Sequence, residues 1–118
     1  MIKTYQSIAS KLGAMENCRK SGNDEWLNKH EEAIQDIVKN EMPSGSGFDN
    51  GTGLNWDKSN PEKLVFETSF HHMNENGYYD GWTAHTVTVT PSLQFGLNLK
   101  VTGKNRNDIK SYIHEMFS

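Results

Sequence analysis

Residues 64–89, with the sequence LVFETSFHHMNENGYYDGWTAHTVTV, decide the fold of this chain. Apolar and polar residues alternate on both sides of Asn76-Gly77, a dipeptide typical of two-residue β-hairpin loops because both positions tolerate positive φ. That loop sets the residues of one face opposite each other: Leu64 and Val89, Phe66 and Val87, Phe70 and Thr83. A slip of one residue would move every side chain to the other face. The sequence therefore predicts an antiparallel hairpin in this register.

Strand periodicity continues from this hairpin toward the C-terminus. Thr90-Pro91-Ser92 is interpreted as a three-residue loop, which would place Leu93 beside Val89 and Phe95 beside Val87. The alternation then runs on to Val101. Capping residues at 105–108 favour a last helix, predicted over 105–117.

The N-terminal third has helical periodicity instead. Tyr5, Ile8, Leu12 and Met15 recur at steps of three and four, and a second apolar stripe runs from Leu27 to Met42, where Pro43 ends it. A short link makes these two helices an antiparallel hairpin over 4–42. Residues 43–53 hold four glycines and are predicted to form a loop, after which Leu54 and Trp56 begin the sheet.

These elements predict a single α+β domain over residues 1–118, because so short a chain has no room for a second core. Its parts are a helical hairpin (4–42), a glycine-rich loop (43–53), a four-stranded antiparallel meander (54–102) and a C-terminal helix (105–117). All three helices are expected on the apolar face of the sheet. The other face would carry Trp82 beside His71. The sequence therefore predicts a homo-oligomer, most simply a dimer, that uses this face or the glycine-rich loop.

Composition excludes several classes of function. Twelve basic and 15 acidic residues give a net charge of −3, so the chain lacks the cationic field that binds long nucleic acids. No apolar run approaches the roughly 18 residues of a membrane helix, and no signal peptide is evident, which predicts a cytoplasmic protein. One cysteine, Cys18, rules out an intrachain disulfide and a cysteine-based zinc framework.

Histidines and hydroxyls give no clear catalytic or metal centre. His71 and His72 would point to opposite faces of a strand, and in the predicted register His72 faces Gly81 while His85 faces Thr68, about 13 Å along the ladder. Hydrogen-bonded histidines are therefore favoured over a metal site. The spacing also reveals no activated nucleophile and no paired acid and base, so neither an enzyme nor a cofactor is predicted.

Three features could bind an anionic ligand. Gly45 and Gly47 with Asp49 could form a nest of backbone N–H groups, although a simple connector explains the same glycines. The basic residues at the start of the last helix could hold a phosphate, or could be an exposed charged turn. Aromatic residues near the hairpin tip could stack a base or pack in a core or dimer. The predicted ligand site comprises Arg106, Lys104, Asn105, Trp82, Tyr79, His71, Gly45, Gly47 and Asp49.

Four segments, at 43–52 (PSGSGFDNGT), 70–73 (FHHM), 79–83 (YDGWT) and 102–109 (TGKNRNDI), make the chain similar to small proteins encoded by bacteriophages and prophages. Its size and layout resemble the phage Thoeris anti-defence family, a sponge for cyclic ADP-ribose-type signals. That resemblance implies a homo-oligomer in the host cytoplasm that binds a signal nucleotide without cleaving it, in pockets shared between subunits. The alternative is a phage interaction protein that blocks or adapts a host protein.

Overall fold

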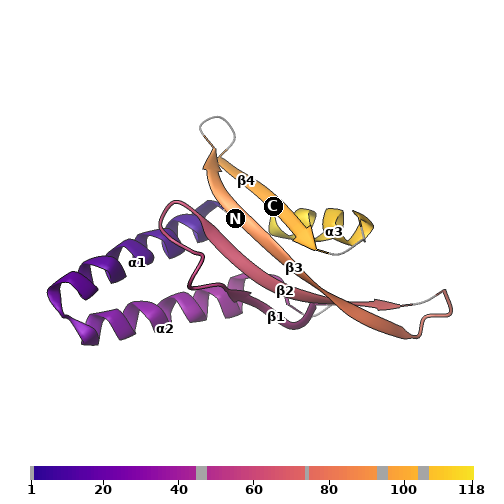
Figure 1. The fold of residues 1–118 in the computed structure, drawn as a ribbon, viewed down its shortest axis with the longest axis horizontal. Coiled ribbons are helices and arrows are strands. Elements are labelled where there is room, and N and C mark those ends of the chain that lie inside the picture. The colour runs from indigo at the N-terminus through magenta and orange to yellow at the C-terminus, as the bar shows by residue number, and fades with distance from the viewer. Residues whose placement is uncertain (1, 45–47, 74, 93–95, 104–106) are drawn as a thin grey trace.

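The computed structural model describes residues 2–44, 48–73, 75–92, 96–103 and 107–118, and it shows the predicted α+β arrangement (Figure 1). Two helices precede a four-stranded antiparallel sheet, and a third helix follows it. The elements are α1 (Ile2–Ser21), α2 (Asp24–Glu41), β1 (Phe48–Leu54), β2 (Leu64–Met73), β3 (Tyr79–Ser92), β4 (Gly96–Gly103) and α3 (Asn107–Phe117).

The sheet is a meander in the order β1-β2-β3-β4, with every neighbouring pair antiparallel. The predicted register of the central hairpin is confirmed from Leu64 to His71, because the pairs include Leu64 with Val89, Phe66 with Val87, Phe70 with Thr83 and His71 with Trp82. The alternation in residues 64–89 is therefore sufficient to fix which side chains face the helices.

The prediction of a two-residue turn at Asn76-Gly77 is wrong, although Gly77 does adopt a positive φ of 81°. β2 ends at Met73 and β3 begins at Tyr79, so Glu75 and Tyr78 do not close the ladder. Between the pairs His71–Trp82 and Met73–Tyr79, β2 advances two residues while β3 advances three. The extra residue is a β-bulge in β3, where Gly81 supplies a φ of 94°.

The predicted loop at residues 90–92 is also wrong. β3 continues through Ser92, so Val89 pairs with Leu99 in place of Leu93, and Val87 pairs with Val101 in place of Phe95. Leu93 and Phe95 themselves lie outside the described residues. Pro91 is tolerated so close to a strand end because it removes only one ladder donor. The register moves by six residues, an even number, so the predicted face of β4 still turns toward the helices.

The glycine-rich segment predicted to be a loop over 43–53 contains the first strand. β1 runs from Phe48 to Leu54, and the chain turns at Trp56, where the sequence predicted a strand. Glycines weaken a strand without preventing one at a sheet edge, where a single neighbour supplies the pairing. The ladder with β2 is itself irregular, with a register shift between Asp49 and Thr52.

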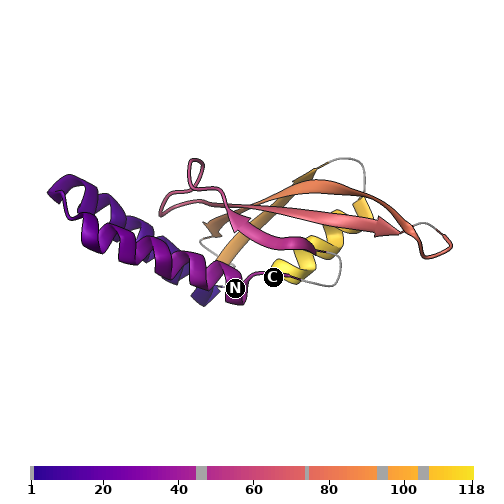
Figure 2. The same ribbon diagram turned by 90° about the horizontal axis from the view of Figure 1, so that it is seen from below.

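One apolar core joins the helices to the sheet. All three helices lie on the same side of the sheet, as Figure 2 shows. The most deeply buried side chains come from helices and central strands alike: Ile8, Met15, Ile34, Leu64, Phe66, Val87, Val89, Ile113 and Phe117. The confirmed alternation in β2 and β3 thus supplies the wall against which the helices pack.

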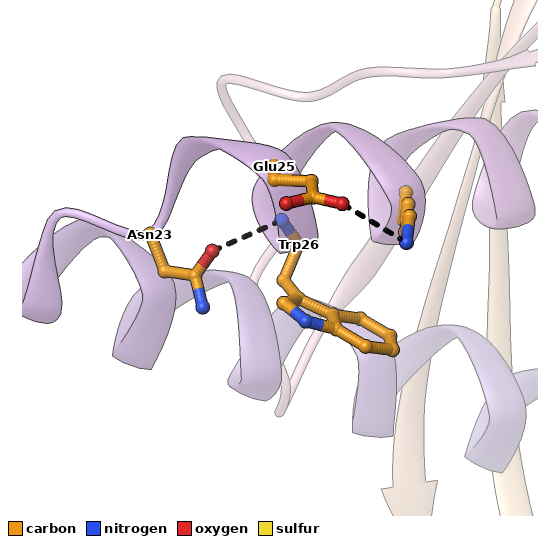
Figure 3. Close-up of polar contacts among 4 residues, drawn as sticks. Asn23, Glu25 and Trp26 are labelled. Carbon is orange, nitrogen blue, oxygen red and sulfur yellow. Dashed lines mark hydrogen bonds and ion pairs between the residues drawn. The ribbon is translucent and has the colours of Figure 1, made fainter.

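Two extensions leave this core in opposite directions, which makes the molecule long, at 56 × 33 × 20 Å. The tip of the α1–α2 hairpin lies at one end and the turn between β2 and β3 at the other (Figures 1 and 2). In the helical hairpin, the buried positions stop at Met15 and resume at Ile34. Asn23 caps α2 at its tip by accepting a hydrogen bond from the Trp26 backbone N–H at 3.2 Å (Figure 3).

Candidate functional site

The extension of β2 and β3 is a two-stranded ribbon, which we call the arm (residues 71–73 and 75–84). The last pair between β1 and β2 toward the arm joins Phe48 to Phe70, and the last pair between β3 and β4 joins His85 to Gly103. Beyond these pairs, the described strands of the arm are hydrogen-bonded to each other and to no further strand. The end of the arm nearest the turn therefore projects from the layered core (Figure 2).

Aromatic side chains gather on this arm. His71 lies opposite Trp82 in the ladder, and the rings of His71 and Tyr79 lie 6.0 Å apart between centroids. We call His71, Tyr79 and Trp82 the aromatic strip. Tyr79 and Trp82 are 64% and 59% exposed, and neighbouring Tyr78 at the turn is 71% exposed. Contiguous exposed aromatic surface of this kind is a common mark of interaction sites.

The bulge in β3 builds the strip. In a regular strand, residues three apart such as Tyr79 and Trp82 point to opposite faces. The extra residue at the bulge turns Tyr79 to the face of His71, and thus of Trp82. Re-aiming a side chain in this way is a common use of β-bulges.

The charged residues of the segment that carries the strip are acidic. From Leu64 to Ser92 the sequence holds three acidic residues and neither lysine nor arginine. Glu67 accepts hydrogen bonds from Thr86 Oγ1 at 2.7 Å and Asn55 Nδ2 at 3.2 Å, so it is engaged within the sheet. Glu75 and Asp80 are exposed on the arm. The segment that carries the strip therefore contributes carboxylates and no lysine or arginine.

A second group of polar residues lies at the base of the arm, on the face toward α3. Thr83 Oγ1 lies 2.7 Å from His72 Nε2 and 2.7 Å from His85 Nε2, so one hydroxyl bridges two imidazoles. His85 is 1% exposed, and its Nδ1 finds no hydrogen-bond partner among the described residues. Because the hydroxyl has a single proton, it can donate to at most one imidazole and must accept from at least one of them.

Burial lowers the pKa of His85 from its ordinary value, and the nearby His72 and Lys110 lower it further. Each of these effects disfavours the charged imidazolium. A neutral His85 can then accept or donate within the Thr83 bridge without a buried charge. His72 and His85 are hydrogen-bonded within the sheet, as predicted. Their predicted separation of about 13 Å along the ladder gave no indication that both would bind the same hydroxyl. Among the described residues, no three metal-ligating side chains come together.

A cleft of about 590 Å³ lies between the C-terminal half of α2 and strand β1. Its apolar wall is formed by Val38, Met42, Leu54 and Trp56, while Lys39 and Gln35 supply polar groups. The volume falls within the range of about 300–1,000 Å³ usual for small-molecule sites. Gly51 and Gly53 also line the cleft, so part of the glycine-rich segment does border a cavity.

The structure separates the predicted ligand-binding residues into groups. His71, Tyr79 and Trp82 meet in the aromatic strip. The backbone of Asp49 belongs to β1, opposite Ser69. The remaining predictions lie outside the described residues: Gly45, Gly47, Lys104, Asn105 and Arg106. The backbone nest at the glycine-rich segment and the phosphate site at the start of the last helix therefore stay predictions.

Sequence reasoning missed both Thr83 and the cleft. Thr83 could have been found, since it shares a strand face with His85 two residues away and lies diagonally across from His72. Nothing in the sequence pointed to the cleft, because the segment that forms β1 was interpreted as a loop.

Trp26, at the tip of the helical hairpin, is an exposed indole that a side chain of its own helix partly covers. Lys29 Nζ lies 4.6 Å from the centre of the Trp26 ring and 3.3 Å from the Glu25 carboxylate. Figure 3 shows the Glu25 and Trp26 side chains on the first turn of α2. Trp26 is still 49% exposed and lies at the opposite end of the molecule from the strip, which makes it a matched control.

Within the described chain, no helix is both long and apolar enough to cross a bilayer. No model of a known protein family, no curated protein and no solved structure matches this chain.

Proposed function

We propose that the protein is a non-catalytic binding protein that docks another protein through the aromatic strip. The observation that carries this proposal is the pair of Tyr79 and Trp82, both more than half exposed on the projecting arm. Tyrosine and tryptophan supply much of the binding energy in protein interfaces when a partner covers them. The resemblance to phage-encoded proteins makes a protein of the host cytoplasm the expected partner.

The bridged histidines support a non-catalytic function. His72 and His85 are 7% and 1% exposed, so their rings are packed within the protein rather than presented to a substrate. Both Nε2 atoms are already taken up by Thr83. A structural role at the base of the arm accounts for these contacts.

Affinity capture with arm variants tests the proposed function. A partner bound by the unaltered protein should be lost with Trp82→Ala and with Tyr79→Ala, because each change removes a large exposed ring that the partner would cover. Trp26→Ala, which removes an exposed ring at the other end, should retain it. Retention of the same partner by all three variants would show that the strip is not the docking surface.

The cleft favours a second candidate function, sequestration of a cyclic ADP-ribose-type nucleotide. Trp56 could stack a base, and Lys39 could pair with a phosphate in a space of suitable volume. The aromatic strip suits such a ligand less well, because the acidic residues of its own segment oppose an anion.

Calorimetry with cyclic ADP-ribose isomers and cyclic di- and trinucleotides tests this second function. Binding that Lys39→Ala weakens by roughly tenfold, with the ligand recovered unchanged, would support sequestration in the cleft. Arg106→Ala tests the same ligand at the start of the last helix. No binding below about 10 μM would remove the nucleotide candidate.

The predicted homo-oligomer is a separate proposal. An arm-to-arm dimer would add the carboxylates of one copy to those of the other, which disfavours the strip as its interface. Analytical ultracentrifugation at micromolar concentration tests it, since a 13.4 kDa particle would exclude self-association at that concentration.

A further inference from the structure

We infer that the cleft between α2 and β1 is a binding site for a small aromatic carboxylate. The cleft shares no residue with the aromatic strip, so this site goes beyond the proposed docking function. Three properties of its lining point to that ligand: apolar walls from two elements, a pair of polar side chains on one turn of α2, and a positive charge limited to one lysine.

The apolar walls suit a flat hydrocarbon body. Val38 and Met42 lie one turn apart on α2 and form one wall, while Leu54 and Trp56 form the other. The first two side chains are buried in the core, and the other two are partly buried against it. A ring between these walls can contact a methionine sulfur and an indole, both of which favour aromatic neighbours. The cleft therefore selects a largely apolar, aromatic ligand.

The polar pair suits a carboxylate. Gln35 and Lys39 are four residues apart on α2, so their side chains are neighbours on one side of the helix. Both are exposed to solvent, and both line the cleft. The Lys39 ammonium and the Gln35 amide N–H groups can donate to the two oxygens of one carboxylate. A ligand with an aromatic body and a carboxylate at its edge would then match the walls and the pair together.

The amount of charge disfavours a phosphorylated ligand. Lys39 is the only charged side chain among the described residues that line the cleft. It lies in the last turn of α2, where the negative end of the helix dipole opposes an anion. One lysine can balance a single carboxylate there, whereas a phosphate dianion or a pyrophosphate would keep excess negative charge. The cleft therefore favours a carboxylate over a nucleotide.

Calorimetric titration with three naphthalene derivatives tests the inference. The probe is 2-naphthoate, which carries a single negative charge. The controls are 2-naphthylmethanol, which has the same ring system and no charge, and 2-naphthyl phosphate, which carries about two negative charges at a pH of about 7.5. We expect 2-naphthoate to bind with a Kd below about 1 mM and at least roughly threefold more tightly than either control.

Protein variants locate the charge contact. Lys39→Met keeps an unbranched stem and removes the charge, so it should weaken 2-naphthoate by roughly fivefold and leave 2-naphthylmethanol unchanged. Lys29→Met is the matched control, because it makes the same change on the same helix outside the cleft. Gln35→Glu, which places a carboxylate in the pair, should also weaken 2-naphthoate alone. Thermal melting by circular dichroism verifies that each variant is folded.

The three tryptophans of the chain locate the ring of the ligand. Trp26 lies at the tip of the helical hairpin, Trp56 at the cleft and Trp82 on the arm. In proton–nitrogen correlation spectra, 2-naphthoate should move the indole N–H resonance of Trp56 and leave the other two in place. Single tryptophan-to-phenylalanine variants assign the three resonances.

Three results would overturn the inference: no binding of 2-naphthoate tighter than about 1 mM, less than a roughly threefold preference over either control, or movement of the Trp26 or Trp82 resonance in place of that of Trp56. Tighter binding of 2-naphthyl phosphate that Lys39→Met weakens would instead favour the nucleotide candidate. The docking function is tested separately, because it depends on capture of a partner through Trp82 and Tyr79.

Discussion

The hydroxyl of Thr83 restricts the protonation of two buried histidines. The hydroxyl has a single proton, so at least one imidazole must donate to it, and two charged rings could bind it only as two donors. Such a pair would also place two like charges around one hydroxyl in the interior. We therefore expect the base of the arm to be most stable when at least His85 is neutral.

This arrangement predicts a fall in stability at mildly acidic pH. The folded protein lowers the pKa of His85, whereas the unfolded chain keeps a value near 6.5, so the unfolded state takes up the proton first. The contribution of His85 to the free energy of unfolding should be fully present above about pH 6.5. It should decrease as the pH falls below this value, until the folded protein also binds the proton. Urea denaturation at several pH values measures the decrease.

His85→Gln should reduce this pH dependence, since it removes the titrating ring. His114→Gln is the control, because His114 is exposed on α3. An equal pH dependence in the His85 variant would mean that other groups cause it.

Gly103 makes room for His85. A Cβ atom built at Gly103 would overlap His85 Nδ1 and would lie 2.9 Å from the carbonyl oxygen of Ala84. Gly103→Ala should lower the free energy of unfolding by about 1–3 kcal/mol, as overpacking does elsewhere. Gly53→Ala is the matched control, because a Cβ there meets nothing within 4 Å. Denaturation of both variants measures the difference, and equal stabilities would contradict the steric argument.

At the level of elements, the bulge of β3 is responsible for the composition of the strip. Gly81→Ala places an L side chain at φ 94°, a conformation that costs about 1–2 kcal/mol. We expect lower stability and loss of the contact between the His71 and Tyr79 rings, with weaker partner binding although every aromatic residue is retained. Nuclear Overhauser effects between the two rings report this contact.

Gly77→Asn is the control for that variant. Gly77 also has a positive φ, at 81°, but asparagine tolerates that conformation better than other residues. An unchanged ring contact in Gly81→Ala would show that the bulge persists without glycine.

The elements that the sequence predicted best are those with long, regular periodicity. The hairpin register from Leu64 to His71 could be predicted because alternation on two strands must agree with one loop. β1 was missed because its glycines carry no hydrophobic pattern, and the start of β4 was misplaced because Pro91 resembles a turn residue. The strip was predicted in part. The position of its residues near the turn could be predicted from the sequence, but the fact that they share one face depends on the bulge.

The whole molecule is more elongated than a typical chain of its length. Its Cα radius of gyration is 15.8 Å, whereas a compact domain of this length has roughly 13.5 Å. Small-angle X-ray scattering should therefore give a radius above that of a compact domain, at a molecular mass of one chain if the protein is monomeric. A compact radius at monomer mass would contradict the projecting hairpin and arm.

The uneven burial along the helical hairpin has a consequence for how the protein opens. From Glu16 to Ala33, a stretch described throughout, every residue is exposed or half-buried. Backbone amides in this half should exchange with solvent deuterium through local fraying, whereas those of β2 and β3 should exchange only when the whole domain opens. The molecule would then loosen progressively from the tip toward Met15 and Ile34, and its slowest-exchanging amides would mark the central strands.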